Sequence, residues 1–344
     1  MIISFNTGKV ETKGGTGLLQ QKRVEITNNG LDVVVPDAGY DGLSTVYVKT
    51  DIAEGGGSSF KDFTAIGYDE EENLLINQEI DNSILYSKEL YDAWNPENTS
   101  ANNLYNGDTK LVYAPAIDTS NVTNMFGMYK RCTNLKVVPK LNTDKVTNMG
   151  DMFSGCTFLT KLDLSSWDTS KVTTMSNMFD NCQNLIEIGN LDTSSATTIS
   201  RMFYGCKSLI TVPKISLKSM VSTSFSSITS KGAYFLNGAT SVTTFGGFVD
   251  CEHITGWGGA DTTNPFSSLT NLTNIQEMGV IKSGFNLSKC TKLTVESLMV
   301  VINALYDYAT EGSTTQTIIL GSTNLNKLSD AQIAVGTSKG WTLS

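Results

Sequence analysis

The chain has 344 residues, of which 17% are charged, and it carries a formal net charge of −9. No clustered stripe of Lys and Arg stands out from this acidic balance, which disfavours nucleic-acid binding because phosphate contacts need concentrated positive charge. No run of about eighteen apolar residues is present, so the sequence predicts no membrane insertion. Ser, Thr, Asn and Gly fill most polar positions, and they indicate a neutral, hydroxyl-rich surface.

Residues 1–58 are expected to form a small all-β module. Runs rich in β-branched residues start at Val24, Asp32 and Thr45, with turn-forming sequences between them. The segment Pro-Asp-Ala-Gly-Tyr-Asp-Gly-Leu-Ser-Thr-Val-Tyr-Val at 36–48 resembles segments near the start of phage tail, fibre and decoration proteins. The Gly-rich stretch Glu54–Ser59 is typical of a flexible linker, so it predicts a domain boundary.

Residues 59–117 are interpreted as a linker and the N-terminal cap of the repeats that follow. They hold an acidic run, Asp69–Glu72, and an apolar-aromatic stretch, Ile80–Trp94. A stack of repeats needs such a cap because its first core layer is otherwise exposed. The acidic run is typical of a solvated turn, since a cation site needs carboxylates that converge from several directions.

From residue 118 to 215 one pattern occurs four times, and the copies are Val122–Leu135, Val146–Leu159, Val172–Leu185 and Ala196–Leu209. The cysteines of these copies, Cys132, Cys156, Cys182 and Cys206, are 24, 26 and 24 residues apart. A period of this size predicts a solenoid, in which each unit buries its apolar face against its neighbours. The two additional residues between Cys156 and Cys182 fall near Ser165–Trp167, where we expect a loop.

Within a unit, apolar residues recur at intervals of three and one, which favours one face of a helical or 3₁₀-like turn. Leu159, Leu162 and Leu164 then give L-x-x-L-x-L, the pattern of a short strand. Each unit is therefore predicted to be a short helix plus a strand, and the fold class an α/β solenoid. Asp-Thr-Ser sequences, as at 168–170, mark the turns between units.

The repeated motif Asp-Thr-Ser-x-Val-Thr-x-Met-x-x-Met-Phe-x-x-Cys-x-x-Leu resembles the BspA-like leucine-rich repeats of bacterial surface proteins and of phage and prophage structural proteins. The resemblance implies a leucine-rich repeat fold with terminal caps. Residues 293–344 resemble the C-terminal cap of such arrays. A helix is predicted to begin near Val295, capped by Thr294, with its apolar face at Leu298, Ile302, Leu305 and Tyr306.

Residues 216–292 are predicted to be degenerate repeats, in which Cys290 occupies the position of the repeated cysteine and Cys251 ends a copy that is one residue short. A cysteine repeated at one position of every unit points inward and acts as a small apolar filler. We therefore interpret Cys132, Cys156, Cys182 and Cys206 as a structural core ladder rather than as disulfides or metal ligands.

The sequence contains no motif that predicts catalysis, a cofactor site or a metal site. Its single histidine, His253, rules out zinc sites that need two His ligands, and no sequence context for a Ser/His/Asp triad is present. Paired carboxylates remain possible, but no spacing singles out a pair. Trp167 and Trp257 are the candidates for surface recognition, because exposed indoles stack on sugars or anchor protein contacts. The alternative is that each covers an edge of the core.

We expect a non-enzymatic structural and binding protein, located in a virion after synthesis in the host cytoplasm. The first residues contain no apolar run of the length found in secretion signals. As a phage fibre or decoration protein, it would dock on capsid or tail proteins through residues 1–58, and its solenoid would bind a host-surface protein or glycan. Such proteins are commonly symmetric, which predicts a homo-oligomer. The alternative is a bacterial cell-surface adhesin, and a secreted glycan-processing enzyme is a third possibility.

Overall fold

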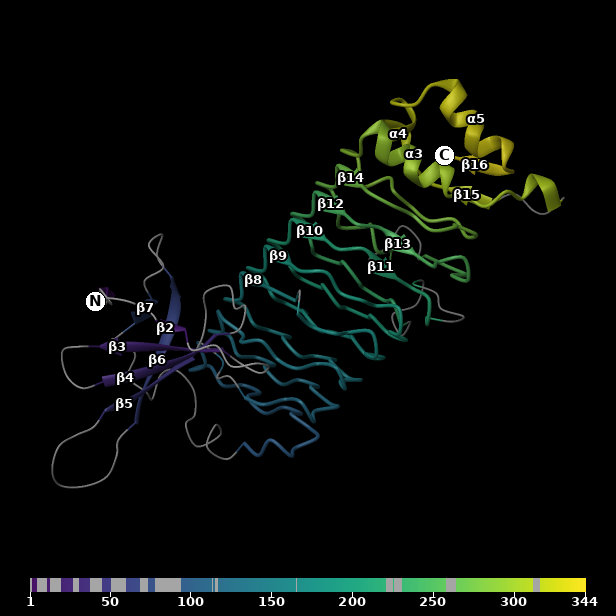
Figure 1. Ribbon diagram of the computed structural model, residues 1–344. Coiled ribbons are helices and arrows are strands. Elements are labelled where there is room, and N and C mark those ends of the chain that lie inside the picture. Colours follow the sequence, from purple (N-terminus) through teal and green to yellow (C-terminus); the bar gives the residue numbers. More distant parts are fainter. Residues whose placement is uncertain are drawn as a thin grey trace. The chain divides into compact units, whose positions relative to one another are not determined.

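The computed structural model divides into two compact units (Figure 1). One comprises Met1–Asn95, Lys110–Asp118 and Val137–Leu141, and the other comprises Pro96–Thr109, Thr119–Lys136 and Asn142–Ser344. The structure describes the strands within residues 2–77 and then residues 94–344, except 113, 115–116, 165, 221–224, 226–230, 258–263 and 312–315. Side chains are described only from residue 94 onward.

The first unit contains a seven-stranded antiparallel sheet. Its strands are β1 (Ile2–Ser4), β2 (Glu11–Thr12), β3 (Gln20–Ile26), β4 (Leu31–Asp37), β5 (Thr45–Thr50), β6 (Phe60–Tyr68) and β7 (Leu74–Asn77). Their order in the sheet is β1-β7-β6-β5-β4-β3-β2. From β2 to β7, each strand is therefore hydrogen-bonded to the next one in sequence, and β1 lies beside β7.

The domain boundary predicted at residue 58 is wrong. Strands β5 and β6 pair in antiparallel fashion across the Gly-rich stretch, with Lys49 opposite Phe60. The stretch therefore connects two neighbours of one sheet, and the sheet continues to Asn77. Glycine and serine suit the connection of a hairpin as well as an interdomain linker, so composition alone does not distinguish the two. The acidic run at 69–72 and the apolar stretch from residue 80 to 93 lie outside the described residues.

In the second unit, equivalent residues of successive repeats pair side by side in parallel. Isolated bridges join Ser100 to Asn124, Asn124 to Asn148, Asn148 to Thr174, and Thr174 to Thr198. Two-residue strands pair on another side: β8 (Lys161–Leu162) with β9 (Glu187–Ile188), and β10 (Thr211–Val212) with β12 (Thr244–Phe245), which pairs with β14 (Asn274–Ile275). A further parallel pair is β11 (Ile215–Ser216) with β13 (Phe248–Val249). The labels β8, β9, β10, β12 and β14 follow one another along one edge of the stack in Figure 1.

The short helix predicted in each repeat is a run of turns instead. Six such turn segments are described, at 100–107, 124–131, 148–155, 174–181, 198–205 and 231–238. In the third segment, Asp151 and Gly155 have φ values of 57° and 79°, and this left-handed backbone cannot continue a right-handed helix. Alternate N–H groups bond to the next segment, as Phe153 N does to Met178 O at 2.9 Å, and those between them bond within the segment, as Ser154 N does to Asp151 O. Apolar residues at intervals of three fit a run of turns as well as a helix, which explains why the sequence predicted a helix.

The core of these segments is a column of stacked rings. The ring centroids of Tyr129 and Phe153 are 5.5 Å apart, those of Phe153 and Phe179 are 5.7 Å apart, and those of Phe179 and Phe203 are 5.5 Å apart. All four side chains are fully buried. Each ring lies three residues before the cysteine of its unit, so the period of the sequence directly produces the column.

The C-terminal residues form helices and a two-stranded sheet. The elements are α3 (Val295–Asn303), the 3₁₀ turn η1 (Ala309–Glu311), β15 (Gln316–Ile318), α4 (Ser322–Leu325), α5 (Asp330–Ser338) and β16 (Trp341–Leu343), and β15 pairs with β16 in parallel. Thr294 caps α3 by accepting a hydrogen bond from Ser297 N, as the sequence predicts. Ser297 Oγ accepts a hydrogen bond of 3.0 Å from Ile275 N, so α3 lies against β14 at the C-terminal end of the stack (Figure 1).

Candidate binding face

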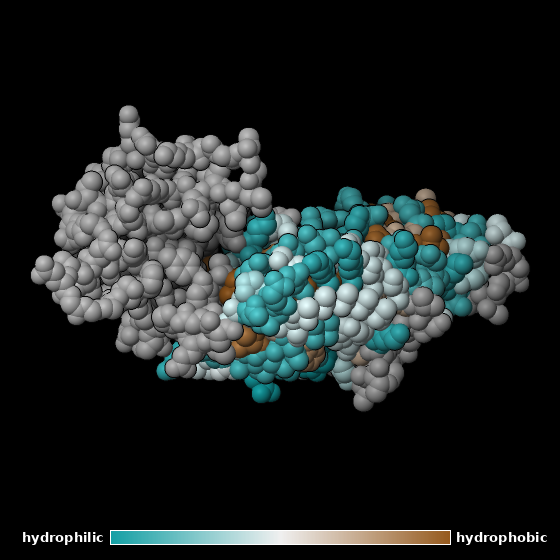
Figure 2. Space-filling view, turned by 60° about the horizontal axis from the view of Figure 1, so that its bottom comes forward, coloured by the Kyte–Doolittle hydropathy of each residue, from teal (hydrophilic) through white to brown (hydrophobic). Residues whose placement is uncertain are grey.

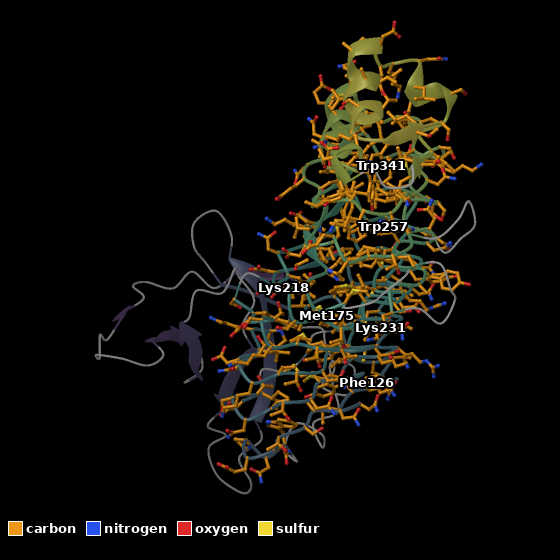
Figure 3. All side chains as sticks on the ribbon, turned by 90° about the vertical axis from the view of Figure 1, so that its right-hand side faces the viewer. Phe126, Met175, Lys218, Lys231, Trp257 and Trp341 are labelled. Carbon is orange, nitrogen blue, oxygen red and sulfur yellow. The ribbon has the colours of Figure 1, made fainter. Side chains whose placement is uncertain are left out.

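The two tryptophans predicted for surface recognition are buried. Trp257 is only 1% exposed and stacks on Phe225 with ring centroids 5.3 Å apart. Trp167 is 8% exposed, and its ring centroid lies 6.2 Å from that of Phe153. Figure 3 shows Trp257 within the width of the stack, among interior side chains. Each indole fills core volume at an irregular unit, so the prediction of a surface role is wrong for both residues.

The cysteines Cys132, Cys156, Cys182 and Cys206 are fully buried and free. Each thiol donates to the carbonyl oxygen of the aromatic residue in the preceding turn segment, as Cys156 Sγ does to Tyr129 O at 3.1 Å. Cys290 makes the same kind of contact with Phe266 O at 3.4 Å. Burial raises the pKa of Cys132 to about 12, so its thiol stays protonated at neutral pH. Among the described residues, no cluster of His, Cys, Asp and Glu has a geometry suited to a metal ion.

One face of the second unit carries a continuous row of polar and aromatic side chains. We call it the turn face and define it by residues of the turn segments that lie outside the core: Asn124, Phe126, Lys130, Asn148, Asp151, Ser154, Thr174, Asn177, Asp180, Thr198, Ser200, Arg201, Tyr204 and Tyr234. In the view of Figure 2, hydrophilic and near-neutral residues dominate the described surface, and hydrophobic residues are confined to small patches.

The first cluster on the turn face joins Phe126, Lys130 and Asp151, and we call it the lysine cluster. Lys130 Nζ lies 2.8 Å from Asp151 Oδ1 and 6.0 Å from the centroid of the Phe126 ring. Asn177 Nδ2 donates to the second carboxylate oxygen of Asp151 at 3.4 Å. Both carboxylate oxygens of Asp151 therefore have a partner. Asp151 is only 9% exposed, so these contacts compensate for its burial.

The second cluster joins Asp180, Arg201, Tyr204 and Tyr234, and we call it the aromatic cluster. Arg201 Nε donates to Asp180 Oδ2 at 2.8 Å, and the guanidinium carbon lies 3.9 Å from the centroid of the Tyr204 ring. The Tyr204 and Tyr234 centroids are 6.3 Å apart, with ring planes at 89°. Burial raises the pKa of Asp180, and the hydrogen bond and charge of Arg201 partly offset that effect.

Sequence reasoning missed both clusters because their residues occupy the variable positions of the repeat. Asp151, Asn177, Arg201 and Tyr234 stand at equivalent places in successive segments, yet they have four different chemistries. All four have positive φ values between 55° and 57°. The available signal was the chemistry of the residue two positions before each core ring, as in Asp151, Asn177 and Arg201, compared between units.

The fold and its turn face define a stacked-repeat protein with two clusters in which a cation lies over a ring and pairs with a carboxylate. Residues 97–214 match the family described as "Mycoplasma protein of unknown function, DUF285". The match includes all four repeats of the BspA-like motif and spans less than half of the chain. No curated protein matches the chain. Within the part of the chain that the structure describes, no helix is long and apolar enough to cross a membrane.

Proposed function

We propose that the protein is a non-enzymatic structural and binding protein, a phage virion fibre or decoration protein whose leucine-rich repeat solenoid attaches to a host surface. The observation that carries this proposal is the turn face, because it presents ordered charged and aromatic groups on a rigid stack. Recognition sites are more precise on such rigid elements than on loops. Tyr and Arg, which occur together in the aromatic cluster, are also enriched among residues that dominate binding energy.

The state of the two partly buried carboxylates supports a binding role over a hydrolytic one. A pair of carboxyl groups can act as acid and base only if one is free to take up and release a proton at the substrate. Asp151 is held by Lys130 and Asn177, and Asp180 is held by Arg201. These contacts favour fixed charges that shape a surface.

The antiparallel sheet of residues 2–77 is the part that we propose to dock on capsid or tail proteins and to form the homo-oligomer. Its edge strands are β1 and β2, each of which has a partner on one side only. Edge strands carry backbone donors and acceptors that can pair with another chain. The docking module of the proposal is thus longer than residues 1–58.

Flow cytometry with the fluorescently labelled full chain tests the attachment function. The chain is mixed with a panel of bacterial species and with mammalian epithelial cells. We expect saturable binding to particular bacteria, and a double variant Phe126→Ser, Tyr204→Ser should bind at least tenfold more weakly. Phe158→Ser is the matched control, because Phe158 is 51% exposed and lies outside the turn face. Absence of saturable binding to every cell type would contradict the proposal.

The alternative is a bacterial cell-surface adhesin of the BspA-like family. The match to a family described from Mycoplasma favours it, because those organisms are bacteria rather than phages. Binding to mammalian cells and not to bacteria would support this alternative over the virion. Identification of the neighbouring genes separates the two in a second way, since capsid, portal or tail genes would support a virion component.

A further inference from the structure

The aromatic cluster forms a corner between two tyrosine rings. The planes of Tyr204 and Tyr234 are nearly perpendicular, and the rings belong to adjacent turn segments. Both side chains are partly exposed, unlike the fully buried rings of the core column. The corner therefore offers aromatic surface to a ligand without exposing the core.

Contacts between neighbours hold this corner in place. Arg201 lies over the Tyr204 ring at 3.9 Å, and its Nε is fixed by Asp180 at 2.8 Å. The side chain of Arg201 is 37% exposed and that of Asp180 is 10% exposed, so the pair is shielded from much of the solvent. A binding surface that is ordered before binding loses less conformational entropy when the ligand arrives.

The charges at the corner compensate one another. The guanidinium of Arg201 faces the carboxylate of Asp180, and along the same face the ammonium of Lys130 faces the carboxylate of Asp151. An anionic ligand is best held by a cation that is free to form charge-assisted hydrogen bonds. The pairing on the turn face therefore fits an uncharged ligand better.

An uncharged saccharide has the chemistry that matches these groups. The C–H groups on a sugar ring carry small positive charges and pack on the negative face of an aromatic ring. Sugar hydroxyls both donate and accept hydrogen bonds, and the residues next to the corner offer amide, hydroxyl and carboxylate groups, on Asn177, Ser200 and Asp180. We propose that the aromatic cluster is a subsite for one neutral saccharide unit of a host-surface glycan. This proposal rests on the attachment function proposed above.

A protein partner fits the corner less well. A stable protein interface buries about 800 Å² on each side and has an apolar centre. The turn segment that carries Tyr204 also presents Thr198 and Ser200, and the segment before it presents Thr174 and Asn177. Such a border of hydroxyl and amide groups matches the hydroxyls of a glycan.

A printed panel of neutral and acidic oligosaccharides, probed with the full chain, tests the ligand class. We expect the strongest signals from neutral oligosaccharides. Titration calorimetry with the strongest of these should then show about fivefold weaker binding for Tyr234→Ala, which corresponds to the roughly 1 kcal/mol that a stacking ring contributes. Tyr234→Phe keeps the ring and should stay within about threefold of the parent. Phe158→Ala, which removes an exposed ring outside the turn face, is the control and should also stay within about threefold.

The results separate this inference from the attachment function. Binding of acidic oligosaccharides alone would overturn the neutral class, and an unchanged affinity in a folded Tyr234→Ala protein would overturn the subsite, while attachment to cells still stands. Cell binding that needs Tyr234, with no signal from any oligosaccharide, would identify a protein ligand and overturn the saccharide assignment. If the chain bound neither cells nor oligosaccharides, the attachment function itself would fail.

Discussion

The Oγ1 atom of Thr169 bridges to the backbone of Asp192 in the next repeat. It donates to Asp192 O at 3.0 Å and accepts from Asp192 N at 2.9 Å. The same two bonds join Thr193 to Ser216, at 2.9 and 2.8 Å. Thr143 stands at the equivalent place before the repeat that is two residues longer, and its Oγ1 is buried without a hydrogen-bond partner. The insertion therefore removes one bridge between repeats.

The first prediction compares valine substitutions at these two threonines. Thr169→Val removes both of these part-buried hydrogen bonds, so the free energy of unfolding should fall by about 1–3 kcal/mol. Thr143→Val replaces an unsatisfied buried hydroxyl by a methyl group of similar size, so it should be neutral or slightly stabilising. Urea unfolding followed by circular dichroism measures both values. Equal destabilisation by the two substitutions would show that the bridge contributes nothing.

The second prediction concerns the stacked column of rings. Phe153 is fully buried between Tyr129 and Phe179, and its truncation to alanine leaves a cavity inside a rigid stack. We expect Phe153→Ala to lower the free energy of unfolding by about 3–5 kcal/mol.

The matched control for this substitution is Phe158→Ala in the same repeat. Because Phe158 is 51% exposed, its removal should change the free energy of unfolding by no more than about 0.5 kcal/mol. Thermal unfolding of the two variants side by side gives the comparison. A smaller effect at Phe153 than at Phe158 is incompatible with the observed column.

The repeat length and the buried positions could be predicted from the sequence because they recur. A cysteine and, three positions before it, a Phe or Tyr recur in each of the four units, because each of these side chains packs against its equivalents in the neighbouring units. The start of α3 was also predictable, since Thr294 is a local capping signal. These features depend on residues close together in the chain or repeated along it.

The turn face and the extent of the first sheet could not be predicted in this way. Arg201 and Asp180 meet only because successive turn segments stack, and neither position repeats its chemistry. The pairing of Lys49 with Phe60 spans a Gly-rich stretch whose composition suits a linker equally well. For Trp257 the sequence leaves both surface recognition and the edge of the core open, and stacking on Phe225, a residue distant in sequence, decides for the core. In each case the deciding contact is distant in sequence.

The third prediction is a loss of stability at alkaline pH that depends on the cysteine ladder. Burial raises the pKa of Cys132 from 9.0 to about 12 in the folded chain. Because the pKa is raised in the folded state, the contribution of the protonated thiol to the free energy of unfolding is fully present below pH 9 and is lost as the pH rises towards 12. The free energy of unfolding should therefore fall by up to about 1.4 kcal/mol per pH unit through this residue alone.

Cys132→Ala lacks this titrating group, so its free energy of unfolding should decline less steeply between pH 9 and 10.5 than that of the parent chain. The comparison uses slopes, because the substitution also removes the hydrogen bond from Cys132 Sγ to Tyr105 O and so lowers stability at every pH. Urea titrations at intervals of half a pH unit provide the slopes. Parallel lines for the two proteins would mean that the thiol is accessible to solvent.

The fourth prediction compares two glycines that both have positive φ. Gly247 has a φ of 111°, and a Cβ atom placed on it would collide with the backbone oxygen of Glu277. Gly107 has a φ of 79°, but a Cβ atom there would meet nothing within 4 Å. Gly107→Ala should therefore cost about 1 kcal/mol, the strain of a left-handed residue with a side chain. Gly247→Ala adds the clash with a backbone that is held on either side by hydrogen bonds from Gln276 N to Phe245 O and from Gly279 N to Phe248 O, so we expect a much larger loss or failure to yield soluble protein. Thermal unfolding and soluble yield are measured for both variants, and equal behaviour of the two would contradict the close approach of residue 247 to Glu277.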